Sequence, residues 1–261
     1  MEQSPPPLEA QPPPPKPATM SLAARLLNVF AIPGDVFEEV KATAASAGNW
    51  LAPVVLSALV GAVSSIIIFS QPAIQQQMRE QQAKAMDRQV KAGKLTQAQA
   101  DQALAVLEKF TGPTMLKILG VVSAVVASFV RVFWWALVLW LLGRWFLKTR
   151  FDYGKTLEIT GLAMMISVLG VLVTLLLTVN LARMFATPSL GLAIKDFDAT
   201  RKSHLMLGAV NVFSIWQVGV MAVGFAKLAG VPFLRAAWFV FAYWVAQELV
   251  FIFIGLGQFA L

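Results

Sequence analysis

The feature that most constrains this chain is a set of five apolar stretches, each about 20 residues long and nearly free of charged side chains. A helix of that length rises about 1.5 Å per residue and crosses roughly 30 Å of hydrocarbon. The composition agrees, because 57% of the residues are hydrophobic and only 13% are charged. We therefore predict an all-α, polytopic membrane helical bundle with five transmembrane helices, over residues 51–70, 118–142, 159–179, 205–226 and 236–260.

The N-terminal part of the chain does not resemble a membrane span. Residues 1–20 hold eight of the 14 prolines, and proline lacks the backbone N–H that helices and strands need, so we predict a disordered Pro-rich tail. This tail is either a solvated spacer or a ligand for a proline-binding domain. Residues 21–49 carry short apolar faces at helical spacing, which predicts interfacial amphipathic helices in front of a membrane domain over residues 50–261.

The long loop between the first two spans is polar. Residues 71–110 are rich in Gln, Ala, Lys and Arg, which favour helices but offer little to bury. Thr96 and Gln99 have the spacing of a capping box that opens a second arm. We predict an extramembrane helical hairpin, which is either a solvated loop or a surface that docks a protein partner.

The residue inventory excludes most catalytic and cofactor chemistry. The chain has no cysteine and one histidine, His204, so disulfides, thiolate metal sites and bis-histidine haem ligation are excluded. No predicted span contains aspartate, and no zinc-protease or nucleophile-elbow motif is present. We predict no catalytic residue, no metal site and no cofactor. The formal net charge of +7 is assigned to lipid headgroups rather than to nucleic acid.

Two charged residues lie inside predicted spans. Arg131 and Glu248 are each ~20 Å along a helix from the charged residue that borders their span, so both fall near the bilayer midplane. A charge at that depth costs ~2.5–3.5 kcal/mol and needs a partner. We predict that the two contact each other, directly or through one water. Asn211 and Gln217 in the fourth span extend this intramembrane polar cluster, which is either a structural lock or part of a conduction path.

Small residues recur at four-residue spacing in the first two spans. Such faces let helix backbones approach closely, either within one chain or in a homo-oligomer. The predicted helix-packing residues are Ser57, Gly61 and Ser65 in the first span and Gly120, Ala124 and Ser128 in the second.

Several short motifs resemble a known family when they are taken in order. They are Phe30-x-x-Pro33-x-x-x-Phe37-x-x-Val40, Trp50-x-x-Pro53, Tyr153-Gly154-Lys155-Thr156-Leu157-x-Ile159-Thr160-Gly161, and Phe213-Ser214-Ile215-Trp216-Gln217 followed by Gly224. Over residues 25–260 the chain resembles the bacterial branch of the Yip family, five-span membrane proteins whose eukaryotic members bind Ypt/Rab GTPases. One departure is the missing proline early in the third span, where Ala163 to Ile166 stand.

The resemblance implies an integral protein of the bacterial cytoplasmic (inner) membrane with its N-terminus in the cytoplasm. Charge counting alone leaves the orientation open, with nine Lys and Arg on one side and eleven on the other. We expect a non-catalytic membrane scaffold or trafficking-type adaptor that contacts the lipid bilayer and holds protein partners through its tail and hairpin. The alternative is a small transporter or channel with a path past Arg131 and Glu248.

Overall fold

The structure, a computed structural model, describes residues 19–110, 112–255 and 257. It confirms the all-α polytopic fold, since five helices in the described part are long and apolar enough to cross a membrane. Most of the predicted Pro-rich tail lies outside the described residues. The five membrane helices are α3 (Gly48–Phe69), α6 (Pro113–Trp145), α7 (Tyr153–Leu181), α9 (Val212–Ala229) and α10 (Phe233–Phe253).

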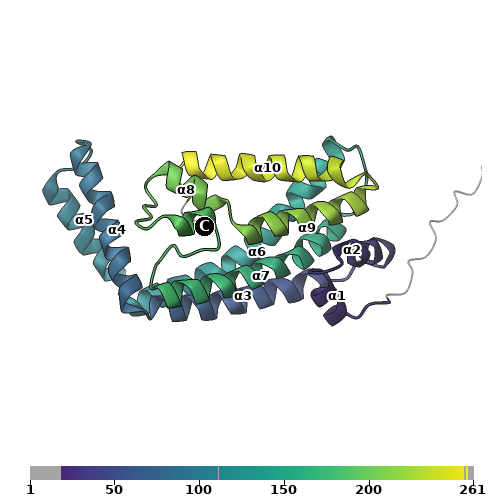
Figure 1. Cartoon of the computed structure of the whole chain (residues 1–261), viewed down its shortest axis with the longest axis horizontal. Coiled ribbons are helices and arrows are strands. Elements are labelled where there is room, and N and C mark those ends of the chain that lie inside the picture. Colours follow the sequence, from purple (N-terminus) through teal and green to yellow (C-terminus); the bar gives the residue numbers. More distant parts are fainter. Residues whose placement is uncertain (1–18, 111, 256, 258–261) are drawn as a thin grey trace, which may run out of the picture.

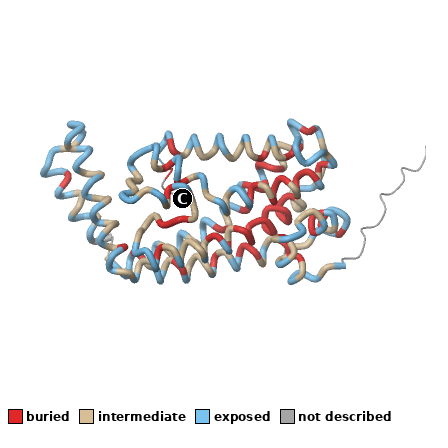
Figure 2. Tube along the Cα trace, viewed as in Figure 1, coloured by how far each residue is buried: buried red, intermediate tan, exposed pale blue. Residues whose placement is uncertain are grey.

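Successive membrane helices run in opposite directions along the long axis of one elongated bundle (Figure 1). Helix α7 is central, because it packs against α3 and α6 on one side and against α9 on the other, and α10 then packs on α9. Buried residues gather in the half of the bundle nearer the N-terminal helices (Figure 2). That half is the close-packed core, with Leu162, Ile166 and Phe225 fully buried.

The fourth predicted span is broken. Residues Lys202–Ala209 form a separate helix, α8, and the helix that continues the span begins only at Val212. The backbone at the break is bonded instead to a neighbouring segment, since Leu190 N–H donates to Val210 O at 3.2 Å and Val212 N–H to Pro188 O at 3.1 Å. A short 3₁₀ helix, η1 (Leu190–Ala193), lies in that segment. The fifth helix also ends earlier than residue 260, at Phe253.

The two N-terminal helices, α1 (Leu22–Asn28) and α2 (Pro33–Ala42), lie at one end of the bundle. The apolar face of α2 does not face outward, because Val36, Phe37 and Val40 are buried against α9 and α7. Gly224 of α9 makes this contact possible, since a Cβ there would stand 3.1 Å from the Phe37 ring. Helix α2 is therefore part of the bundle core. An interfacial position of α1 stays a prediction.

The polar loop forms α4 (Pro72–Lys91) and α5 (Gln97–Phe110) at the opposite end of the bundle (Figure 1). The turn between them contains Gly93 at φ +68°, a left-handed conformation that glycine adopts without strain. Thr96 and Gln99 form the reciprocal capping box, with Thr96 N–H donating to Gln99 Oε1 at 2.9 Å and Gln99 N–H to Thr96 Oγ1 at 3.2 Å. Helix α4 runs across the end of the bundle rather than continuing α3, so the hairpin lies along the face of the membrane domain.

Candidate functional site

Three of the four residues predicted as an intramembrane polar cluster line one cavity of about 450 Å³. Arg131 comes from α6, Gln217 from α9 and Glu248 from α10, and α7 adds Ser167. Three tryptophans from α6 and α10 also line the cavity, and the composition gave no sign of that role. They are Trp134, Trp135 and Trp244.

Arg131 and Glu248 do not form a direct ion pair. Within the described residues neither side chain reaches an opposite charge within 4.0 Å, and the buried Oε2 of Glu248 lacks a hydrogen-bond partner. Both side chains line the same cavity, but they do not contact each other directly. The direct form of the predicted contact is therefore absent, and the contact through one water stays a prediction.

Asn211 has a different position from the one predicted. It precedes α9 as its N-cap, and its Oδ1 accepts a hydrogen bond from Phe213 N–H at 2.9 Å. Asparagine is among the best N-cap residues, so the signal for this break was present in the sequence. Gln217, one turn into the helix, is buried and bonded to the Ser167 hydroxyl of α7. Of the two polar residues predicted to extend the cluster, Asn211 thus caps a helix and Gln217 forms an interhelical bond.

The six predicted packing residues meet in pairs across α3 and α6. Ser128 Oγ donates to Ser57 Oγ at 3.4 Å, a Cβ on Gly61 would lie 3.0 Å from the Ala124 Cβ, and one on Gly120 would lie 2.8 Å from the Ser65 Cβ. The residue numbers rise on one helix as they fall on the other, as antiparallel packing requires. The small residues therefore serve the contact between α3 and α6 within one chain.

A buried polar network joins the N-terminal helices to the bundle, and the sequence reasoning missed it. Arg25 of α1 contacts Glu39 of α2 at 2.8 Å and Asn49 Oδ1 of α3 at 3.2 Å. Asn49 Nδ2 then donates to Glu158 Oε2 of α7 at 2.5 Å. Lys155 forms an ion pair with Glu158 at 2.9 Å and donates to the backbone carbonyl at the end of α2 at 2.7 Å. One connected network thus fastens four helices together at this end.

Glu39 is the most strongly bonded acid of this network. Burial by itself would raise its pKa. Hydrogen bonds from the Thr19 hydroxyl, the Met20 backbone and Arg25, together with the charge of Arg25, outweigh burial and lower the pKa to about 2. The carboxylate is therefore charged at neutral pH, and its charge holds the start of α1 against α2.

Comparisons with known proteins give one result. The family model described as the Yip1 domain matches residues 27–256, a range that includes the five membrane helices and, of the buried network, Glu39, Asn49, Lys155 and Glu158. No curated protein and no solved structure matches the chain.

Proposed function

Since the chain belongs to the Yip1 domain family, whose members are trafficking-type membrane proteins, we propose that it is a non-catalytic membrane scaffold or adaptor. The proposed partner surface is the outer side of α1 and α2. The buried network at their base is the observation that carries this proposal.

The two sides of α2 differ sharply in character. One side is apolar and buried in the bundle, whereas Asp35, Glu38 and Lys41 on the other side are exposed. Glu38 also pairs with Lys227 at the end of α9, at 3.1 Å. This charged surface stands clear of the core and is free to meet a protein partner outside the membrane.

The network supports a binding role because it holds this surface in one position. An ion pair that is nearly buried, such as Arg25–Glu39 with side-chain exposures of 6% and 10%, is costly to break once formed. A surface that is rigid before binding loses little conformational entropy when a partner docks, so preorganisation favours affinity. A helix pair that only coated the lipid surface would not need such fastening.

Photocrosslinking in cells tests the proposal. The photoreactive residue p-benzoylphenylalanine in place of Asp35 should give discrete protein adducts, whereas the same residue in place of Leu176, on the exposed apolar side of α7, should not. Glu39→Gln should reduce the Asp35 adducts because it loosens the surface. Asp87→Asn, an equal charge change in the exposed hairpin, should leave them unchanged.

A flux assay separates this function from transport. The protein is reconstituted in vesicles loaded with potassium and a pH-sensitive dye that reports proton entry. Neither potassium nor protons should cross the membrane faster than in vesicles without the protein. Flux that Arg131→Leu abolishes would refute the scaffold and establish the transporter or channel. Adducts at Asp35 that persist unchanged in Glu39→Gln would refute the network as the basis of the partner surface.

A further inference from the structure

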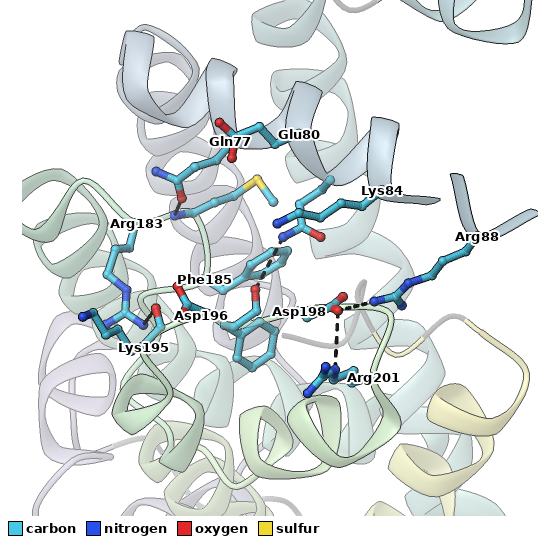
Figure 3. Close-up of a pocket in the computed structure, with 13 residues that line it drawn as sticks. Gln77, Glu80, Lys84, Arg88, Arg183, Phe185, Lys195, Asp196, Asp198 and Arg201 are labelled. Carbon is cyan, nitrogen blue, oxygen red and sulfur yellow. Dashed lines mark hydrogen bonds and ion pairs between the residues drawn. The ribbon is translucent and has the colours of Figure 1, made fainter. Parts of the chain in front are cut away.

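A cavity of about 690 Å³ lies outside the spans, between α4 and the segment over residues 183–201 (Figure 3). We propose that this cavity binds the phosphate of an anionic phospholipid headgroup. It lies at the end of the bundle opposite the α1–α2 surface, so the proposal is independent of the scaffold function.

The cavity is built by specific contacts between its two walls. The Gln77 amide of α4 donates to Ala182 O at 2.7 Å and accepts from Met184 N–H at 3.0 Å. Further along α4, Gln81 Nε2 donates to Phe197 O at 3.4 Å. The hairpin is therefore fastened over the 183–201 segment, and hydrogen bonds join the two walls of the cavity.

The charges that line the cavity are mostly basic. Five cationic side chains face three acidic ones, which leaves a net charge of +2. The acids are Glu80, Asp196 and Asp198, and the cations are Lys84, Arg88, Arg183, Lys195 and Arg201. An anion in this cavity meets an excess of positive charge.

Two of the arginines contact one aspartate. Asp198 contacts Arg88 at 2.5 Å and Arg201 at 3.7 Å. Burial alone would raise the pKa of Asp198, but bonds from Thr200 and Arg88 and the charge of Arg88 lower it to about 2. Asp198 therefore stays anionic, and it lines the cavity together with the two arginines.

The other three cations keep their charge available. Arg183 donates to the backbone carbonyls of residues 192, 194 and 195, which hold the guanidinium in place without cancelling its charge. Lys84 and Lys195 have neither an ion pair nor a hydrogen bond within the described residues, and both are exposed at the cavity (Figure 3). One fixed guanidinium and two exposed, unpaired ammonium groups form a suitable site for a phosphate.

The position of the cavity favours a lipid as the source of the phosphate. Arg183 follows the end of α7 at Leu181 by two residues, and Gln77 contacts this same level. Helix α4 runs across the end of the bundle, and its Gln77 bonds to Ala182 and Met184 next to the end of α7. The side of the cavity next to the end of α7 is therefore at the depth of the lipid headgroups, where the phosphodiesters of neighbouring lipids lie.

The test measures lipid binding to the full chain in detergent. Dihexanoyl phosphatidylglycerol and dihexanoyl phosphatidylcholine are titrated by microscale thermophoresis against the wild type and the double variant Lys84→Gln/Lys195→Gln. An interfacial lysine contributes about fivefold to binding of an anionic lipid, so the double variant should bind phosphatidylglycerol about 30-fold more weakly. The control Lys91→Gln/Lys94→Gln removes the same number of charges from the hairpin but lies outside the cavity, and should change binding less than twofold.

Three results would overturn the proposal. The first is equal weakening in the control, and the second is phosphatidylcholine binding as tight as that of phosphatidylglycerol. The third is tight binding of inorganic phosphate that phosphatidylglycerol does not displace, which would assign the cavity to a soluble phosphate. Thermal unfolding of both double variants should match the wild type, because neither Lys84 nor Lys195 holds a structural contact within the described residues.

Discussion

Replacing Glu39 with glutamine should detach α1 from the bundle without unfolding the membrane helices. The carboxylate receives hydrogen bonds from Thr19 and Met20 and pairs with Arg25 at 2.8 Å. Glutamine keeps the shape of the side chain but removes its charge, so Arg25 stays buried without a counter-ion. Removal of one partner from such a buried pair is strongly destabilising.

The magnitude follows from the pKa of Glu39. A pKa lowered from 4.5 to about 2 corresponds to about 3 kcal/mol of extra stability for the charged, folded form. The Glu39 side chain is only 10% exposed, so solvent screens this interaction little. We therefore expect the α1–α2 contact to weaken by about 2–3 kcal/mol at pH 7, which speeds local opening by about 100-fold.

Hydrogen exchange followed by mass spectrometry measures this opening directly. Amides of α1 in Glu39→Gln should exchange about 100-fold faster than in the wild type, while those of α7 stay protected. Glu38→Gln is the matched control, because Glu38 is the neighbouring residue but is exposed and pairs only with the exposed Lys227. Its effect should be below about 1 kcal/mol.

Acidification provides a second test of the same reasoning. Because the folded-state pKa of Glu39 is lowered, its contribution is complete above pH 4.5 and is lost as the pH falls toward 2. Protection of α1 should fall over this interval in the wild type and change little in Glu39→Gln. Equal exchange in Glu39→Gln and Glu38→Gln at pH 7 would show that the network does not hold α1.

Two further predictions concern the membrane helices. Gly161→Ala should lower the free energy of unfolding in detergent by about 3 kcal/mol, because its Cβ would stand 2.3 Å from the Trp50 Cα. The control Gly219→Ala, where a Cβ would have no atom within 4 Å, should be neutral or slightly stabilising. In a double-mutant cycle of Arg131→Leu and Glu248→Leu, the double variant should recover part of the loss, with a coupling of about 1 kcal/mol. Strictly additive losses would exclude a contact through water, and a coupling of about 3 kcal/mol would indicate the direct pair that the structure lacks.

The sequence alone determined the all-α fold and the helical character of the spans. A run of about 20 apolar residues can satisfy its backbone hydrogen bonds in lipid only as a helix, so this inference needs no knowledge of neighbouring elements. The four-residue spacing of Ser57, Gly61 and Ser65 likewise places them on one face, because helix geometry is local. Which helix that face would meet was left open until α6 supplied the opposing residues.

Tertiary structure alone decided which polar groups meet. Asn49 and Glu158 are 109 residues apart in the chain, and they contact only because α3 and α7 pack side by side. In the sequence Glu158 marked only the polar border of a span.

Arg131 and Glu248, which the sequence predicted to contact each other, form no direct ion pair. Helix α10 packs along α9 and reaches α6 through side chains such as Trp134 and Gln247, and the two charges line one cavity without a direct ion pair. Their depth near the bilayer midplane stays a prediction. Depth follows from the rise per residue of one helix, whereas lateral distance depends on which helices pack together, and no single span encodes that choice.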